Sequence, residues 1–207
     1  MTKAQVIILF FAVVSATGPL NSQGAFQNLD FEQAQVVFLP GDSTNIFAAN
    51  AQPGWTVFQG TTQVSFISYN HAPNPPGAGL LGPGSSSVLD GKYSAFVADD
   101  AISQTGLVPA DAISLRFVQL PGWITSSLQV SLNGQNLSYI SLGGTVWGAD
   151  ISAFAGQTAT LTFSGVGLFD DIQFSPELIP EPSFSWPPFL GSGVLLYLYN
   201  HKKHSTT

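Results

Sequence analysis

Hydrophobic and polar residues alternate in short runs through the middle of the chain, without sustained helical spacing. In the run 114–120, Leu115 and Phe117 fall on one side and Arg116 on the other, as in a half-buried strand. The run 63–69 alternates less strictly, which is typical of a strand buried on both faces. The strands expected from such runs are 55–59, 63–69, 93–98, 113–120, 128–132, 136–142, 158–163 and 167–174.

Turn-forming residues separate these runs. Asn133-Gly134 stands between two strands, and this dipeptide is typical of a two-residue type I′ hairpin. The segments 73–79 and 82–87 are rich in Gly, Pro or Ser and predict loops. Short strands separated by turns in this way predict an all-β fold, a two-sheet antiparallel β-sandwich.

The first 25 residues have the pattern of a secretory signal peptide. Lys3 precedes an apolar stretch at 6–14, and small residues follow at Val14-Ser15-Ala16 and at Gly24-Ala25. We therefore expect an N-terminal signal helix within residues 1–25 and export of the protein. The alternative is an N-terminal membrane anchor, for which the apolar stretch is short.

The C-terminal tail has three parts in order. Pro180-Glu181-Pro182 is followed by a mostly apolar run at 184–199 and a basic cluster at 201–204. An apolar helix partitions into the bilayer while lysines stay on its cytoplasmic side, so the run predicts a transmembrane helix. It is short, since a span takes about 20 residues, and Pro187 and Pro188 disturb its first turn.

This order resembles the PEP-CTERM sorting signal of Gram-negative bacteria, with Pro180, Glu181 and Pro182 as its motif. The resemblance implies export, an inner-membrane intermediate, and recognition by exosortase, a membrane protease. It also implies a cell-surface or extracellular-matrix destination and an association with exopolysaccharide. The tail departs from the usual pattern in its Lys/His end and in its two prolines. A plain tail anchor and a hydrophobic C-terminal strand are the alternatives.

The resulting organisation is a signal peptide at 1–25, a β-domain at 26–176 and a sorting tail at 177–207. Only 8% of the 207 residues are charged, and the net charge is −7. Lys92 and Arg116 are the only basic residues between positions 25 and 177, so nucleic acid is excluded as a partner of this region. The absence of cysteine excludes disulfides and thiolate chemistry.

Both ends of the β-domain resemble jelly rolls of the carbohydrate-binding-module-like, or galactose-binding-like, type. The matching segments are 28–32, which ends in Glu32, and 168–174, which contains Asp170 and Asp171. The resemblance implies that the first and last strands lie close and hold a structural Ca²⁺ through Glu32, Asp170 and Asp171. Carboxylates are ligands that Ca²⁺ prefers. The alternative is that these acids cap strand ends and accept hydrogen bonds from backbone amides.

Few other residues offer catalytic chemistry. Asp99-Asp100 follows a predicted strand and is expected in a solvated loop; a cation site or half of a catalytic acid pair is the alternative. His71 is the only histidine between the two termini and is expected at a loop surface. We therefore predict no catalytic residues and no enzyme activity.

Sugar binding needs exposed aromatic rings, because a ring face suits the C–H groups of a pyranose. Trp123 and Trp147 lie beside glycines and are the candidate glycan-binding residues, whereas Trp55 begins an apolar strand and is expected in the core. The predicted function is a non-enzymatic surface or matrix protein associated with exopolysaccharide. A carbohydrate-binding module with a defined glycan site is the alternative, followed by a glycan hydrolase.

Overall fold

A computed structural model describes residues 25–71, 77–123 and 127–180. The predicted transmembrane helix at 184–199 lies outside these residues, as do Glu181, Pro182 and all of the predicted signal helix except Ala25. Within the described ranges, no helix is both long and apolar enough to cross a membrane.

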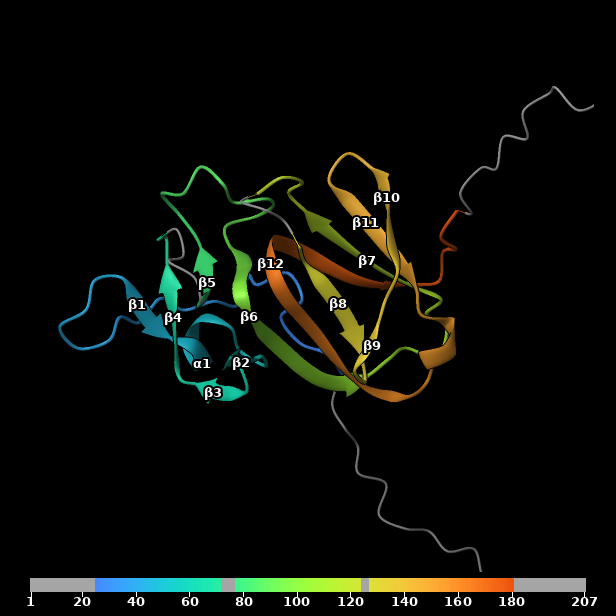
Figure 1. Cartoon of the computed structure of the whole chain (residues 1–207), viewed down its shortest axis with the longest axis horizontal. Helices are drawn as coiled ribbons and strands as arrows, with labels where there is room; N and C mark the ends of the chain where they lie inside the picture. The colour runs from blue at the N-terminus through green and yellow to red at the C-terminus, as the bar shows by residue number, and fades with distance from the viewer. Residues whose placement is uncertain (1–24, 72–76, 124–126, 181–207) are drawn as a thin grey trace, which may run out of the picture.

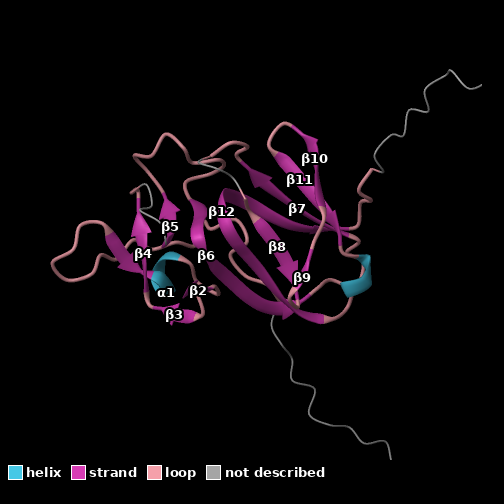
Figure 2. Ribbon diagram, in the orientation of Figure 1, coloured by secondary structure: helices cyan, strands magenta, loops and turns pink. Residues whose placement is uncertain are grey.

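The described chain consists mainly of strands, as Figures 1 and 2 show, and this confirms the all-β prediction. The strands are β1 (Asn45–Phe47), β2 (Thr56–Gln59), β3 (Thr62–Val64), β4 (Phe66–Tyr69), β5 (Gly77–Leu81), β6 (Ser94–Leu107), β7 (Ser114–Gln119), β8 (Gln129–Leu132), β9 (Gln135–Asn136), β10 (Tyr139–Gly143), β11 (Val146–Asp150) and β12 (Thr158–Ser175). One short helix, α1 (Ala48–Ala51), follows β1, and a 3₁₀ turn, η1 (Ser152–Phe154), precedes β12.

Hydrogen bonds join all twelve strands into a single mixed sheet, with the order β1-β4-β5-β6-β12-β7-β11-β10 along its main path. The pairs are antiparallel except β4 and β5, which run parallel, so the prediction of a wholly antiparallel arrangement is wrong. The long strands β6 and β12 connect the two ends of the sheet. β12 pairs with β6 from Thr158 to Phe169 and with β8 on the other side from Leu161 to Ser164, and it then pairs with β7 from Phe169 to its end.

Both long strands continue where the sequence pattern predicted an interruption. The register between β6 and β12 shifts at Gly165/Val166, where a β-bulge adds one residue to β6. That residue is Asp99, which has a φ of +61°, and Gly165 opposite has a φ of +84°. The predicted loop at Asp99-Asp100 is therefore wrong, because the bulge absorbs these residues within β6.

The main core lies on the inner faces of these strands. It includes Phe163 and Phe169, whose rings stack at 4.3 Å, and Phe31, which is fully buried. Trp55 is 6% exposed and its indole N–H donates to the carbonyl of Asn28 at 3.1 Å, which confirms it as a core residue. Burial of an aromatic side chain of this kind is worth about 1.5–3 kcal/mol.

A second, smaller cluster covers the other face of the sheet. It consists of Leu81, Phe96 and Leu168, with Leu120 and Trp123 packed against them. Their strand neighbours Leu80, Val97 and Phe169 belong to the main core, so this part of the sheet is buried on both faces.

Two local predictions about strands need correction, and one turn is confirmed. In the run 63–69 only Ile67 is buried, and the run breaks at Ser65 into β3 and β4, so it is not a strand buried on both faces. Residues 77–79 of the predicted loop 73–79 belong instead to β5, which is the parallel partner of β4. Asn133 and Gly134 have φ values of +49° and +76° between β8 and β9, as a type I′ turn requires.

Candidate functional site

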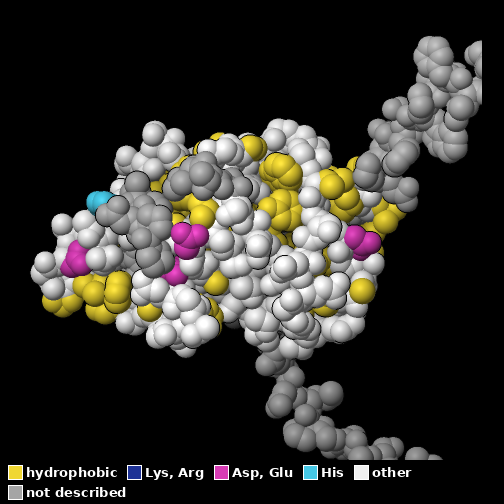
Figure 3. Space-filling view, viewed as in Figure 1, with side chains coloured by type: hydrophobic (Ala, Val, Ile, Leu, Met, Phe, Trp, Pro, Cys, Tyr) yellow, Lys and Arg dark blue, Asp and Glu magenta, His cyan; other side chains and the backbone are white. Residues whose placement is uncertain are grey.

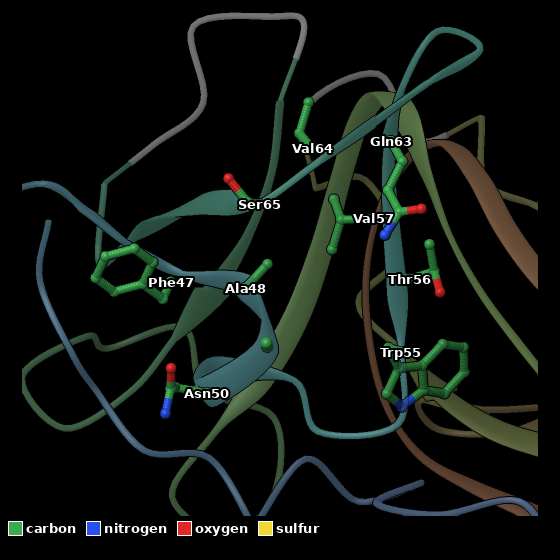
Figure 4. A pocket seen from close by; sticks show the side chains of 10 residues that line it. Phe47, Ala48, Asn50, Trp55, Thr56, Val57, Gln63, Val64 and Ser65 are labelled. Atoms are coloured by element: carbon green, nitrogen blue, oxygen red, sulfur yellow. The ribbon is translucent and has the colours of Figure 1, made fainter.

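A concave surface lies between α1, β2 and β3. We call it the large hollow; its volume is about 510 Å³, and it is lined by Phe47, Ala48, Ala49, Asn50, Trp55, Thr56, Val57, Gln63, Val64 and Ser65. In Figure 4, Phe47 stands on one side, Thr56 and Gln63 stand on the other, and Val57 lies between them. The backbone N–H of Ala48 donates to the carbonyl of Ser65 at 2.9 Å, which fixes α1 beside the β3–β4 break.

Strand register explains why Phe47 is exposed at this edge. Phe47 in β1 lies opposite Phe66 in β4, and its backbone N–H donates to the carbonyl of Val37. Alternate residues of a strand point to opposite faces, so their neighbours Ile46 and Ile67 point into the core. Val37, Phe47 and Phe66 are 41%, 37% and 45% exposed, and they form a cross-strand apolar row on the outer face.

The polar groups around the large hollow are neutral. Asn50, Gln63 and Ser65 are exposed, Thr56 is half-buried, and the lining includes no Asp, Glu, Lys, Arg or His side chain. On the face drawn in Figure 3, acidic groups are few and separate, and no Lys or Arg is visible. Amide and hydroxyl groups both donate and accept hydrogen bonds. Beside an exposed aromatic ring, they can bind a neutral polyhydroxylated ligand.

A second depression, the small hollow, lies on the other side of Val64. Its volume is about 150 Å³, and it is lined by Asn45, Gln59, Val64, Phe66, Ile67, Ser68, Gly77, Ala78 and Asp100. Asp100 is 6% exposed, and one of its carboxylate oxygens accepts a hydrogen bond from the Gly60 N–H at 3.2 Å. Burial raises the pKa of Asp100 above its usual range, the Gly60 N–H lowers it, and the neighbouring Asp99 charge raises it again.

The two tryptophans predicted to bind glycan lie elsewhere. Trp123 is half-buried on the smaller cluster, with its ring 5.6 Å from that of Phe96. Trp147 is a half-buried member of β11 and packs edge-on against Tyr139 at 5.7 Å, beside the main core. They pack on different clusters, so they do not form one stacking platform.

The predicted calcium ligands Glu32 and Asp170 flank the same loop, residues 89–93. One oxygen of Glu32 accepts hydrogen bonds from the backbone N–H groups of Lys92 and Tyr93 at 2.6 and 2.9 Å. The first and last segments are indeed neighbours, because the N–H of Ile172 in β12 donates to the carbonyl of Leu29. Both acids therefore hold a protein loop in place.

Asp170 is 1% exposed and is surrounded by protein donors. Its Oδ2 accepts from the Ser94 hydroxyl at 2.6 Å, its Oδ1 accepts from the Asp171 N–H at 2.7 Å, and the Asp90 N–H donates to the same carboxyl group. Burial raises the pKa of Asp170 to about 7; the hydrogen bonds lower it, and the Asp90 charge raises it. This carboxyl group is a buried structural acceptor in the arrangement seen here.

Asp171 bonds to a residue of its own strand. Its φ is +45°, and both of its carboxylate oxygens accept from the Gln173 amide at 2.9 Å. Across residues 25–71, 77–123 and 127–180, no group of three His, Cys, Asp or Glu side chains lies close enough to hold a metal ion.

Two further predicted residues can be placed. His71 lies exposed in a bend after β4, as expected of a loop residue. Pro180 is exposed at the end of a segment held to β7, where Arg116 forms an ion pair with Glu177 at 2.5 Å. The Pro-Glu-Pro sequence that resembles a sorting motif thus begins directly after a segment held to β7.

Sequence analysis named two of the residues that line the hollows: Trp55, as a core residue, and Asp100, as a loop acid with a cation site or a catalytic pair as the alternative. It missed the others. Phe47 and Phe66 become neighbours only through β1–β4 pairing, which no local pattern indicates. Asp100 had a usable signal: a second acid directly after a strongly apolar run is compatible with a bulge in a longer strand.

Comparison with models of protein families, with curated proteins and with solved structures finds no match.

Proposed function

We propose that this chain is an exported, non-enzymatic surface or matrix protein that is sorted through its C-terminal tail and binds neutral polysaccharide. The binding part rests on the large hollow, which is lined by an exposed Phe47 together with neutral amide and hydroxyl groups. This composition favours a defined glycan site over a diffuse association with exopolysaccharide.

The sorting part rests on the tail. Pro180-Glu181-Pro182, the apolar run at 184–199 and the basic cluster at 201–204 resemble a PEP-CTERM signal. An exosortase-type membrane protease is the proposed partner, the inner membrane holds the intermediate, and the cell surface or extracellular matrix of a Gram-negative bacterium is the destination. The pattern at 1–25, which is typical of a signal peptide, is a second indication of export.

The proposed architecture is a jelly-roll sandwich. Support comes from the adjacency of the first and last segments and from the long strands β6 and β12, which allow one continuous sheet to curl into two layers. Such folds carry unrelated functions, so the fold itself does not identify a ligand.

A glycan hydrolase receives less support. Hydrolysis of a glycosidic bond commonly uses two carboxyl groups that flank it. The lining residues of the two hollows supply one carboxyl group, that of Asp100. Binding without cleavage is therefore the proposed activity.

Co-sedimentation tests the binding part. The full chain, kept in detergent, is incubated with insoluble neutral polysaccharide and with exopolysaccharide from an exporting Gram-negative host. We expect the wild-type chain to sediment and Phe47→Ala to remain in solution. Val146→Ala is the matched control, since Val146 in β11 is as exposed as Phe47, at 37%. Equal sedimentation of both variants, or none by the wild type, would contradict the proposal.

Intact mass tests the sorting part. The chain recovered from an exporting host should lack the residues after about position 182 and the first 16 to 25 residues. A mass that retains residues 184–207 would make the tail a plain membrane anchor.

A further inference from the structure

The small hollow differs from the large one because it contains a carboxyl group. Asp100 is more than nine-tenths buried but lines the depression, and its Oδ1 accepts from the Gly60 N–H. Within the described part of the chain, Oδ2 has no hydrogen-bond partner. Because Oδ2 is not among the buried atoms that lack a partner, it is open to solvent in the hollow, where a ligand hydroxyl group can donate to it.

The bulge in β6 places this side chain. Asp99 occupies the extra position with a left-handed φ of +61° and is exposed, whereas Asp100 returns to the ladder opposite Gly165 and is buried. Bulges commonly redirect a side chain beside a functional site. Two adjacent acids thus have different surroundings, which makes Asp99 a natural control for Asp100.

The two hollows are neighbours that share one lining residue. Val64 lines both, Phe47 lines the large hollow, and Phe66 lines the small one. Phe47 and Phe66 lie directly opposite each other across β1 and β4, and side chains in that relation have Cβ atoms about 4.5–5.5 Å apart. A ligand that lies over this ring pair can therefore reach both depressions at once.

We propose that the small hollow is a second sugar subsite in which Asp100 accepts hydrogen bonds from ligand hydroxyl groups, so that the ligand is a neutral sugar chain of at least two units. The inference rests on the proposed function and deepens it. Asn45, Gln59 and Ser68 supply neutral donors and acceptors around the carboxylate. An acidic sugar is disfavoured, because its carboxylate would face that of Asp100.

Calorimetric titration of the full chain in detergent tests the subsite. The probes are β-1,4- and α-1,4-linked gluco-oligosaccharides of one to six units, with an oligo-uronate as the anionic counterpart. We expect one neutral series to bind, with affinity rising from one unit to two or more, and the oligo-uronate not to bind. A hydrogen bond to a charged group implies that Asp100→Asn weakens binding about 10-fold or more.

Asp99→Asn is the matched control, because it removes the same charge one residue away on an exposed side chain; we expect a change of less than about two-fold. Asparagine at position 100 retains an acceptor for Gly60, and Phe66→Ala tests the subsite without touching the bulge. If Phe47→Ala weakens binding while Asp100→Asn and Phe66→Ala do not, the second subsite is wrong and the proposed function stands.

Failure of the wild-type chain to bind any neutral series would overturn both proposals. If Phe66→Ala instead changes the sedimentation coefficient of the chain and no oligosaccharide binds, the apolar row is a protein–protein surface and the inference is wrong.

Discussion

Asp100 in β6 and Asp170 in β12 are both buried carboxylic acids, but their surroundings differ. Asp170 accepts from the hydroxyl of Ser94 and from backbone N–H groups, which use both of its oxygens. Asp100 accepts from a single N–H group and lines a depression. The first arrangement stabilises a loop, whereas the second leaves an acceptor available to a ligand.

The comparison shows that burial of an acid does not by itself identify a binding residue. Asp170 has the more perturbed pKa, yet its partners are all protein groups. Asp100 is the better candidate because its free oxygen, its neutral neighbours and the exposed Phe66 occur together. The number of protein donors around each carboxyl group therefore distinguishes the structural acid, Asp170, from the candidate binding residue, Asp100.

The largest expected effect is on stability, from Asp170→Ala. Its removal leaves the Ser94 hydroxyl and the Asp171 and Asp90 N–H groups without their acceptor, and an unsatisfied buried group costs about 1–3 kcal/mol. After allowing for the relieved burial of the carboxyl group, we expect the free energy of unfolding to fall by about 2–4 kcal/mol. Urea unfolding measures the change.

Asp100→Ala is the comparison variant in that experiment. It removes one hydrogen bond and should cost about 0.5–1.5 kcal/mol. Equal losses for Asp100→Ala and Asp170→Ala would contradict the distinction between the two acids.

The next effect is a pH dependence of stability caused by Asp170. Its pKa is about 7 in the folded protein against an ordinary 3.8. Between these values the folded state binds more protons than the unfolded state, so stability falls as pH rises from about 4 to about 7. The slope from this one group is at most about 1.4 kcal/mol per pH unit.

Asp170→Asn should remove that contribution. Urea unfolding at intervals from pH 4 to pH 8 gives the difference in unfolding free energy between wild type and variant. The difference should change steadily through this range. A difference independent of pH would show that Asp170 is ionised at its ordinary pKa in the folded protein.

The smallest expected effect is that of calcium. Because Glu32 and Asp170 are occupied by protein donors and Asp171 by Gln173, a chelator should leave the thermal midpoint unchanged within about 1 °C, since 1 kcal/mol corresponds to several degrees in a domain of this size. A fall of several degrees on chelation, reversed by added Ca²⁺, would restore the three acids as a metal site.

Sequence analysis predicted much of the architecture. Alternation identified β7 and β8, the Asn133-Gly134 turn formed as expected, and Trp55 is in the core. These features depend on local periodicity or on a local backbone preference. The first and last segments also proved to be neighbours.

The errors arose where long-range pairing decides the structure. The bulge at Asp99 lets β6 continue through residues that look like a loop in the sequence. Gly77 belongs to β5, whose parallel pairing with β4 no local pattern indicates. The candidate site was missed for the same reason. Phe47 and Phe66 meet through strand register, and Asp100 lines a depression only because the bulge shifts its direction.

Hydroxyl-radical footprinting of the full chain, with and without saturating neutral polysaccharide, tests the central claim most directly. It reports, in one experiment, the solvent accessibility of individual side chains at the two hollows and at the two tryptophans. The account predicts protection of Phe47 and Phe66 and unchanged labelling of Trp123 and Trp147. Protection of the two tryptophans with unchanged labelling of the two phenylalanines would contradict it and would place the glycan site where the sequence alone had predicted it.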